Sequence, residues 1–237
     1  MWLFNALVIA HIFSGTIGLI TLWVPIFGLK GGDKHKRWGV IFSNSLLITG
    51  CIAIGISLVT LRWPLETHPF TTDKAMVVGV FGWMMLYLAT LTIMLSRYGL
   101  WCVRNRRDHK ANRTPLNFAL QLATFITAAN CAWQGYQIQQ PLMIGMSIVG
   151  IAASILNTRF LLTDSPPLNE WLIQHQRGLV GAGISVYTAF LAFGAVNFLP
   201  SIALHPVLWA IPTTSGVTYL LVHQARVMKM RSKRTLA

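Results

Sequence analysis

Long apolar stretches recur along the whole chain and are separated by short segments rich in Gly, Pro and charged residues. A bilayer core about 30 Å thick requires about 20 mostly apolar residues in a helix that satisfies its own backbone hydrogen bonds. Seven stretches meet this requirement. We predict transmembrane helices over residues 2–28, 38–62, 75–98, 115–136, 141–162, 178–199 and 206–227. We therefore expect an all-α integral membrane bundle, residues 1–237 in one domain with a basic cytoplasmic tail at 228–237.

Composition agrees with this pattern. Residues of the AVILMFWYC group make up 54% of the chain, charged residues only 11%, and the mean hydropathy is +0.57. Such values are typical of multi-pass membrane proteins rather than soluble domains. The first stretch lacks a basic n-region and is long for a signal sequence, so we expect it to remain in the protein as a helix.

The chain has 19 Lys and Arg against 6 Asp and Glu, a formal net charge of +13. Such an excess indicates either nucleic acid or an anionic membrane surface as a partner. All the basic residues except Arg62 and Lys74 fall in the tail or in the loops on one side of the predicted membrane. The positive-inside rule then places the N-terminus outside and the C-terminus in the cytoplasm. The charge thus reports topology, and we expect anionic lipid headgroups, not nucleic acid, as the partner at the cytoplasmic face.

Several chemistries are excluded by what the apolar spans lack. All six acidic residues are predicted to lie in loops, whereas proton-coupled carriers usually place a carboxylate inside the membrane. The last span has no central lysine for a retinal Schiff base, and no phosphate-binding or dinucleotide motif is present. The three cysteines (Cys51, Cys102, Cys131) form no CxxC pair and no metal-ligand spacing.

The fourth span carries a stripe of neutral polar residues at helical spacing. Its members are Asn117, Gln121, Thr124, Thr127, Asn130 and Gln134. Residues three or four apart share a helix face, so this face is predicted to point into the bundle. Interhelical hydrogen bonding is the favoured interpretation. The alternative is the lining of a cavity or path for a small solute.

Small residues four apart mark close helix contacts in several spans. The pairs are Ser14 with Gly18, Ala75 with Gly79, Gly150 with Ser154, and Gly181 with Ser185. They predict packing rather than function.

His11 lies near the middle of the first span, where an ionisable group is a candidate functional residue. The alternative is a neutral imidazole that is hydrogen-bonded to a carbonyl or to the polar stripe. A six-coordinate haem with two histidine ligands would need a second histidine at similar depth, and none occurs there.

The most specific pattern lies at the predicted cytoplasmic surface, where a histidine and then an arginine precede three of the spans. The pairs are His35 with Arg37, His109 with Arg113, and His175 with Arg177. The first and third share the motif H-x-R-x-x-V, 140 residues apart. If these helix ends meet, up to three imidazoles could hold a transition metal or haem, or could bind an anion beside the guanidinium groups. The simpler alternative is contact between the arginines and lipid headgroups.

Four runs of the sequence are similar to motifs of a known family. The runs are His11–Gly18 (HIFSGTIG), Lys30–Gly39 (KGGDKHKRWG), His175–Phe190 (HQRGLVGAGISVYTAF) and Trp209–Gly216 (WAIPTTSG). They resemble motifs of a family of uncharacterised bacterial multi-pass predicted membrane proteins, a domain of unknown function with H-x-x-x-G in helix 1 and a His/Arg loop before helix 2. The resemblance implies the bacterial cytoplasmic (inner) membrane and singles out His11, His35 and His175. It implies no activity. This chain has Lys36-Arg37 where the family typically has an arginine pair.

Three functional classes stay open at this point. A protein that binds a metal, haem or a small anion through its histidines is favoured, and the sequence does not decide whether it is an enzyme. A carrier or channel lined by the polar stripe is the first alternative. The second is a non-catalytic assembly or sensing subunit that contacts another membrane protein or a second copy of itself.

Overall fold

The computed structural model describes residues 1–194 and 206–235, and over these residues it is helical with no strand. The α-helices are α1 (Trp2–Thr21), α2 (Trp23–Phe27), α3 (Asp33–Arg62), α4 (Pro64–Thr67), α5 (Lys74–Met76), α6 (Met85–Arg104), α7 (Pro115–Gln137), α8 (Pro141–Leu162), α9 (Glu170–Ala189) and α10 (Pro206–Thr235). Two π-helices, η1 (Val77–Met84) and η3 (Phe190–Gly194), and one 3-10 helix, η2 (His109–Asn112), complete the order. The all-α class is confirmed.

Four helical segments of the described chain are long and apolar enough to cross a membrane. They are Trp2–Phe27, Asp33–Arg62, Lys74–Arg104 and Pro141–Leu162. They correspond to the predicted spans at residues 2–28, 38–62, 75–98 and 141–162. Among the described residues the structure thus has four helical segments that meet the requirement, not the seven that the sequence predicts.

The remaining predicted spans coincide with α7, α9 and α10, which do not meet the same requirement over their described residues. In α7 the polar stripe lowers the hydropathy of an otherwise apolar helix. The first turns of α9 are polar, and residues 195–199 of the predicted span lie outside the described residues. The last turns of α10 belong to the basic tail.

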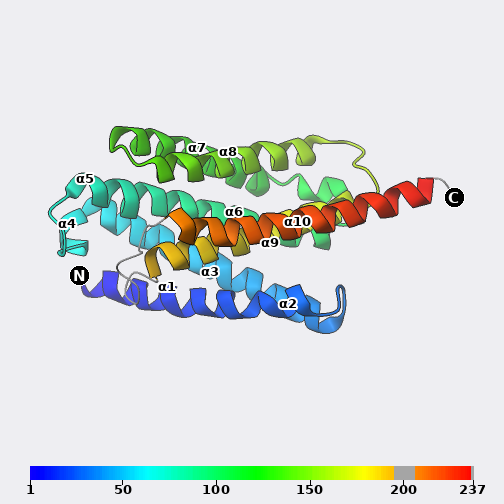
Figure 1. Ribbon diagram of the computed structural model, residues 1–237, viewed down its shortest axis with the longest axis horizontal. Helices are drawn as coiled ribbons and strands as arrows, with labels where there is room; N and C mark the ends of the chain where they lie inside the picture. The colour runs from blue at the N-terminus through cyan, green and yellow to red at the C-terminus, as the bar shows by residue number, and fades with distance from the viewer. Residues whose placement is uncertain (195–205, 236–237) are drawn as a thin grey trace.

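Helix α6 lies at the centre of the arrangement and packs against α3, α7 and α9. The segment that contains it is the most buried of the four candidate spans. Around it, α1 packs on α3, α7 on α8, and α10 on α9. Figure 1 shows the long helices side by side, with the N-terminus, α4 and α5 at one end and the loop after α2 and the C-terminus at the other. The order of packing brings the start of α3, the end of α6 and the start of α9 together at the second end.

The closest approach of two helices is the crossing of α6 and α9. A methyl group added at Gly178 would lie 2.5 Å from the Cα of Gly99, a distance no real pair of such atoms keeps. Only glycines allow the two backbones to touch here, and small residues serve this purpose in membrane helix pairs. The crossing lies one turn from His175 and sets its position.

Two side chains fix the loop from α2 to α3 by hydrogen bonds to backbone carbonyls at the end of α2. Lys30 Nζ donates to the carbonyls of Pro25 and Ile26, and His35 Nδ1 lies 3.2 Å from the Pro25 carbonyl oxygen. Gly31 has a φ of +77°, which a side chain would strain. Lysine near a helix C-terminus satisfies carbonyls left without intrahelical partners. The loop is thereby held against the start of α3.

Candidate functional site

A cavity of about 830 Å³ lies at the end of the bundle where α2 ends, α3 begins, α6 ends and α9 begins, and α10 closes its side. We call it the basic cavity. Its charged or titratable lining residues are Lys30, His35, Lys36, Arg106, His175, Tyr219, His223 and Arg226. None of the described residues that line it is Asp or Glu. Lys36 is paired with Asp33, which lies outside the lining, at 3.7 Å between Nζ and Oδ1. The other three cations, Lys30, Arg106 and Arg226, create a positive potential that favours an anion.

Two imidazoles lie edge to face in this cavity. The ring centroids of His35 and His175 are 6.4 Å apart with an interplanar angle of 63°. His35 Nδ1 lies 3.2 Å from the carbonyl oxygen of Pro25, and His175 Nδ1 lies 2.9 Å from that of Gly99. A carbonyl only accepts, so both Nδ1 atoms carry the proton and each Nε2 remains for a ligand. Each ring is held in one orientation by the backbone of a neighbouring helix.

The H-x-R-x-x-V motif has a structural explanation in these contacts. Both histidines and both valines, Val40 and Val180, line the basic cavity. The arginines differ, because Arg37 is exposed whereas Arg177 donates to Gln224 Oε1 on α10 at 3.1 Å. The motif thus contributes one pair of residues from α3 and a matching pair from α9 to one site.

The side-chain oxygen of Gln176 adds an unsatisfied acceptor to this lining. Gln176 Oε1 is buried and has no hydrogen-bond partner among the described residues. A buried acceptor without a partner costs stability that a donor on a ligand would restore. A hydroxyl group or a protonated phosphate oxygen could supply that donor.

His109 does not join the other two histidines. Its ring packs against Phe160 of α8 at a centroid distance of 4.5 Å, and burial together with the charge of Arg113 lowers its pKa, so the ring is neutral near pH 7. Over residues 1–194 and 206–235 no group of three His, Cys, Asp or Glu side chains could hold a metal ion. The suggestion that three imidazoles converge on one metal is therefore corrected to a pair. Haem needs only two axial ligands. That these histidines bind haem therefore stays a prediction, which a visible absorption spectrum of the purified protein tests.

The contacts of Arg113 explain why His109 does not join His35 and His175. Its guanidinium donates to the carbonyls of Leu161 at 2.6 Å and Thr163 at 2.9 Å and to Asp164 Oδ1 at 2.9 Å. These bonds tie the loop before α7 to the end of α8, away from α3 and α9. Arg113, predicted as an anion or headgroup ligand, thus acts as a cap of α8.

The ion pair of Arg113 with Asp164 predicts a pH dependence. The hydrogen bond and charge of Arg113 hold the pKa of Asp164 below its usual range. A carboxylate with a depressed pKa stabilises the fold above its unfolded pKa of about 3.9, and the contribution is lost as the pH falls through the folded value. We expect the thermal midpoint of Asp164→Asn to lie below that of the wild type at pH ~7 and to approach it as the pH falls through the folded pKa of Asp164. Parallel curves for the two proteins across this range would contradict the ion pair.

His11 connects two helices. Its Nδ1 lies 3.3 Å from the carbonyl oxygen of Thr49 on α3, and Thr49 Oγ1 donates to Ser14 Oγ at 2.8 Å. These contacts favour the interpretation of His11 as a hydrogen-bonded imidazole between α1 and α3. His11 lines neither the basic cavity nor the apolar hollow described below.

The polar stripe of α7 lies against α6 and α8. Asn157 Nδ2 donates to Gln121 Oε1 at 3.3 Å, Thr124 Oγ1 donates to the Thr90 carbonyl at 3.3 Å, and Thr127 Oγ1 lies 2.8 Å from Thr90 Oγ1. Within the same face, Asn117 Nδ2 donates to the Asn112 carbonyl, whereas Asn130 Nδ2 is buried without a hydrogen-bond partner among the described residues. Neither Asn130 nor Gln134 lines the basic cavity or the hollow on α1. These contacts favour interhelical bonding.

A double-mutant cycle tests this role. Gln121→Leu removes one of two partners of Asn157 Nδ2, which also lies 3.2 Å from Met94 Sδ, and Asn157→Leu leaves Gln121 Oε1 without this donor. We expect an interaction energy between the two amides of about 0.6–1.7 kcal/mol in the free energy of unfolding. The double variant removes both amides and should lose less than the sum, measured as unfolding of the purified protein in mixed micelles. Strictly additive losses would show that the two amides do not interact.

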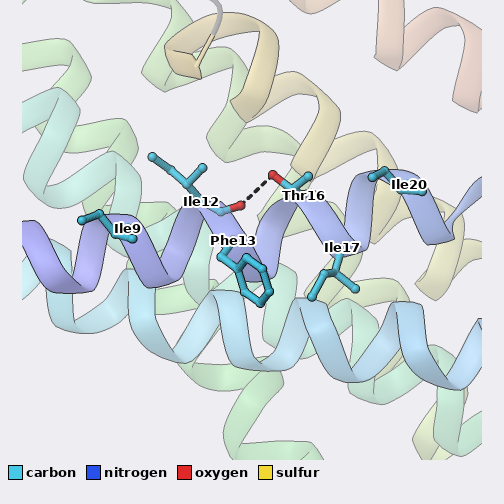
Figure 2. Close-up of a pocket in the computed structure, with 6 residues that line it drawn as sticks. All are labelled: Ile9, Ile12, Phe13, Thr16, Ile17 and Ile20. Atoms are coloured by element: carbon cyan, nitrogen blue, oxygen red, sulfur yellow. Dashed lines mark hydrogen bonds between the residues drawn. The ribbon is translucent and has the colours of Figure 1, made fainter.

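A second hollow, of about 550 Å³, lies on the outer side of α1 and is lined by Ile9, Ile12, Phe13, Thr16, Ile17 and Ile20. Figure 2 shows these side chains along one helix, with the Thr16 hydroxyl bonded back to the Ile12 carbonyl. Its lining offers no free polar group, and such an exposed apolar face suits lipid chains rather than a specific ligand.

The sequence did not single out several residues of the basic cavity, namely Lys30, Arg106, Tyr219, His223 and Arg226. Tyr219, His223 and Arg226 are spaced four and three apart, which places them on one face of α10. The Tyr219 and His223 rings are 4.2 Å apart, and Lys30 Nζ lies 6.0 Å from the Tyr219 ring centroid. The four- and three-residue spacing of Tyr219, His223 and Arg226 was the feature of the sequence that could have indicated a shared polar face on this helix.

No protein-family model, no curated protein and no solved structure matches this chain. The resemblance to a bacterial membrane-protein family therefore stays a prediction.

Proposed function

We propose that this chain is a multi-pass protein of the bacterial cytoplasmic membrane, with seven transmembrane helices and its N-terminus outside, that binds an anionic ligand in the basic cavity. Four described spans of membrane-crossing length and composition support the membrane assignment. The end of the bundle that holds the loop after α2 and the C-terminus then faces the cytoplasm (Figure 1). The basic cavity opens at this end.

The observation that carries the proposal is the lining of the cavity, which has Lys30, Lys36, Arg106 and Arg226 with three imidazoles and no described carboxylate. Cations of this kind repel a metal ion and attract phosphate or carboxylate groups. A neutral imidazole whose Nδ1–H binds a carbonyl offers an anion no donor at Nε2. The rings donate to the anion only when protonated; burial disfavours this form at His175 by lowering its pKa, and the charge of a bound anion favours it. The histidines are thus proposed as anion ligands beside lysine and arginine.

Trp171 provides a reporter for the test, because it lines the cavity, with its ring 5.8 Å from the Arg106 guanidinium carbon. The full chain in nanodiscs of phosphatidylcholine is titrated with methyl phosphate and, separately, with tetramethylammonium. We expect a saturable change of fluorescence with methyl phosphate only, and its loss in Trp171→Phe. Calorimetric titration of both proteins supplies a second readout that does not depend on the tryptophan. Equal responses to the two ions, or no binding by either method, would overturn the proposal.

A further inference from the structure

The walls of the basic cavity are apolar below its charged mouth. Leu22, Phe42, Leu100, Val103, Leu179 and Val227 contribute to them. Phe42 and Val227 are each only 2% exposed, whereas Lys30, Lys36, Arg106 and Arg226 are all exposed. At least two apolar side chains of the lining, Phe42 and Val227, therefore lie deeper than its exposed cations.

The volume is too large for a small anion alone. At about 30 Å³ per water molecule, a cavity of about 830 Å³ has room for more than twenty waters, whereas a phosphate group fills the space of only a few. Water left against apolar walls is unfavourable, and pockets of this size and character bury mostly apolar ligands that a few polar groups orient. The walls thus fit a ligand with a hydrocarbon part.

We infer that the ligand is an anionic amphiphile, whose phosphate or carboxylate head lies among the cations and imidazoles at the mouth and whose alkyl chain lies against the apolar walls. This inference rests on the proposed function, since it assigns a tail to the anion proposed there. The cavity opens at the end where the proposed topology places the cytoplasmic headgroups, so such a ligand enters with its head already at that level.

A series of water-soluble probes tests the tail. Methyl, butyl and hexyl phosphate are titrated into the protein in phosphatidylcholine nanodiscs, with hexyltrimethylammonium as the cation of equal chain length and empty nanodiscs as the correction for partitioning. Each methylene that leaves water strengthens binding by up to about fourfold. We expect hexyl phosphate to bind at least about tenfold more tightly than methyl phosphate, and more tightly than hexyltrimethylammonium.

Val40 supplies a matched pair of variants. Val40 lines the cavity and is 43% exposed, whereas Val222 on α10 is 46% exposed and lies outside the lining. Val40→Asn should weaken binding of hexyl phosphate more than binding of methyl phosphate, and Val222→Asn should change neither. The thermal midpoints of both variants establish that they fold.

The outcomes separate the two proposals. Equal affinities for methyl and hexyl phosphate would overturn the amphiphile while the anion site stands. Binding of neither phosphate would overturn both. Hexyltrimethylammonium that binds as tightly as hexyl phosphate would show an apolar pocket without selectivity for anions, and so would overturn the proposed function.

Discussion

Replacement of Gly178 by alanine is expected to separate α6 from α9 and to cost about 1–3 kcal/mol of stability or more. The added methyl would lie 2.5 Å from Gly99 Cα, 2.7 Å from Gly99 N and 2.9 Å from the Leu95 carbonyl oxygen. All three atoms belong to the backbone, so no side-chain rotation relieves the contact. His175 would move away from the Gly99 carbonyl that orients its ring. The variant should therefore lose both stability and anion binding.

The neighbouring glycine on the same helix supplies the control. A methyl at Gly181 would meet only the end of the Leu95 side chain, at 3.4 Å, which is ordinary contact. Gly181→Ala should keep the wild-type midpoint, measured by thermal unfolding with size-exclusion detection in detergent. If Gly178→Ala unfolds at the same temperature as Gly181→Ala, the described crossing of α6 and α9 is wrong.

The sequence predicted α7 and α8 closely because their signal is local, whereas α9 begins at Glu170, before the predicted 178. Helix α8 spans the predicted residues 141–162, and α7 extends the predicted 115–136 by one residue. The packing of one helix on another was harder to predict from the sequence. Gly181 was marked by its spacing from Ser185, whereas the tighter contact of Gly178 with Gly99 joins two helices whose pairing no local pattern reveals.

The candidate site was predicted in part for the same reason. The repeated motif singled out His35 and His175, whose rings the fold brings edge to face with centroids 6.4 Å apart. His109 carried a similar local signal, yet Arg113 binds its loop to the end of α8. Arg226 lines the cavity only because α10 returns to the end of the bundle where α2 ends, a consequence of tertiary structure.

Reversal of the charge at Arg226 should weaken binding of methyl phosphate by about tenfold, equivalent to about 1.4 kcal/mol. Arg226 lines the mouth of the basic cavity and is exposed, so Arg226→Glu changes the local charge by two units without disturbing the core. Solvent and salt screen an exposed charge, which is why the expected loss is modest for a reversal.

Lys229 lies on the same helix and is also exposed, but it is outside the lining of the cavity. Lys229→Glu changes the net charge of the protein equally and should leave the affinity close to that of the wild type. The difference between the two variants, measured by titration with methyl phosphate, should shrink as sodium chloride is raised from ~0.01 M to ~1 M, because the screening length falls from about 30 Å to about 3 Å. Equal losses in the two variants would mean that net charge alone attracts the anion, whereas a loss confined to Arg226→Glu assigns the attraction to the cavity itself.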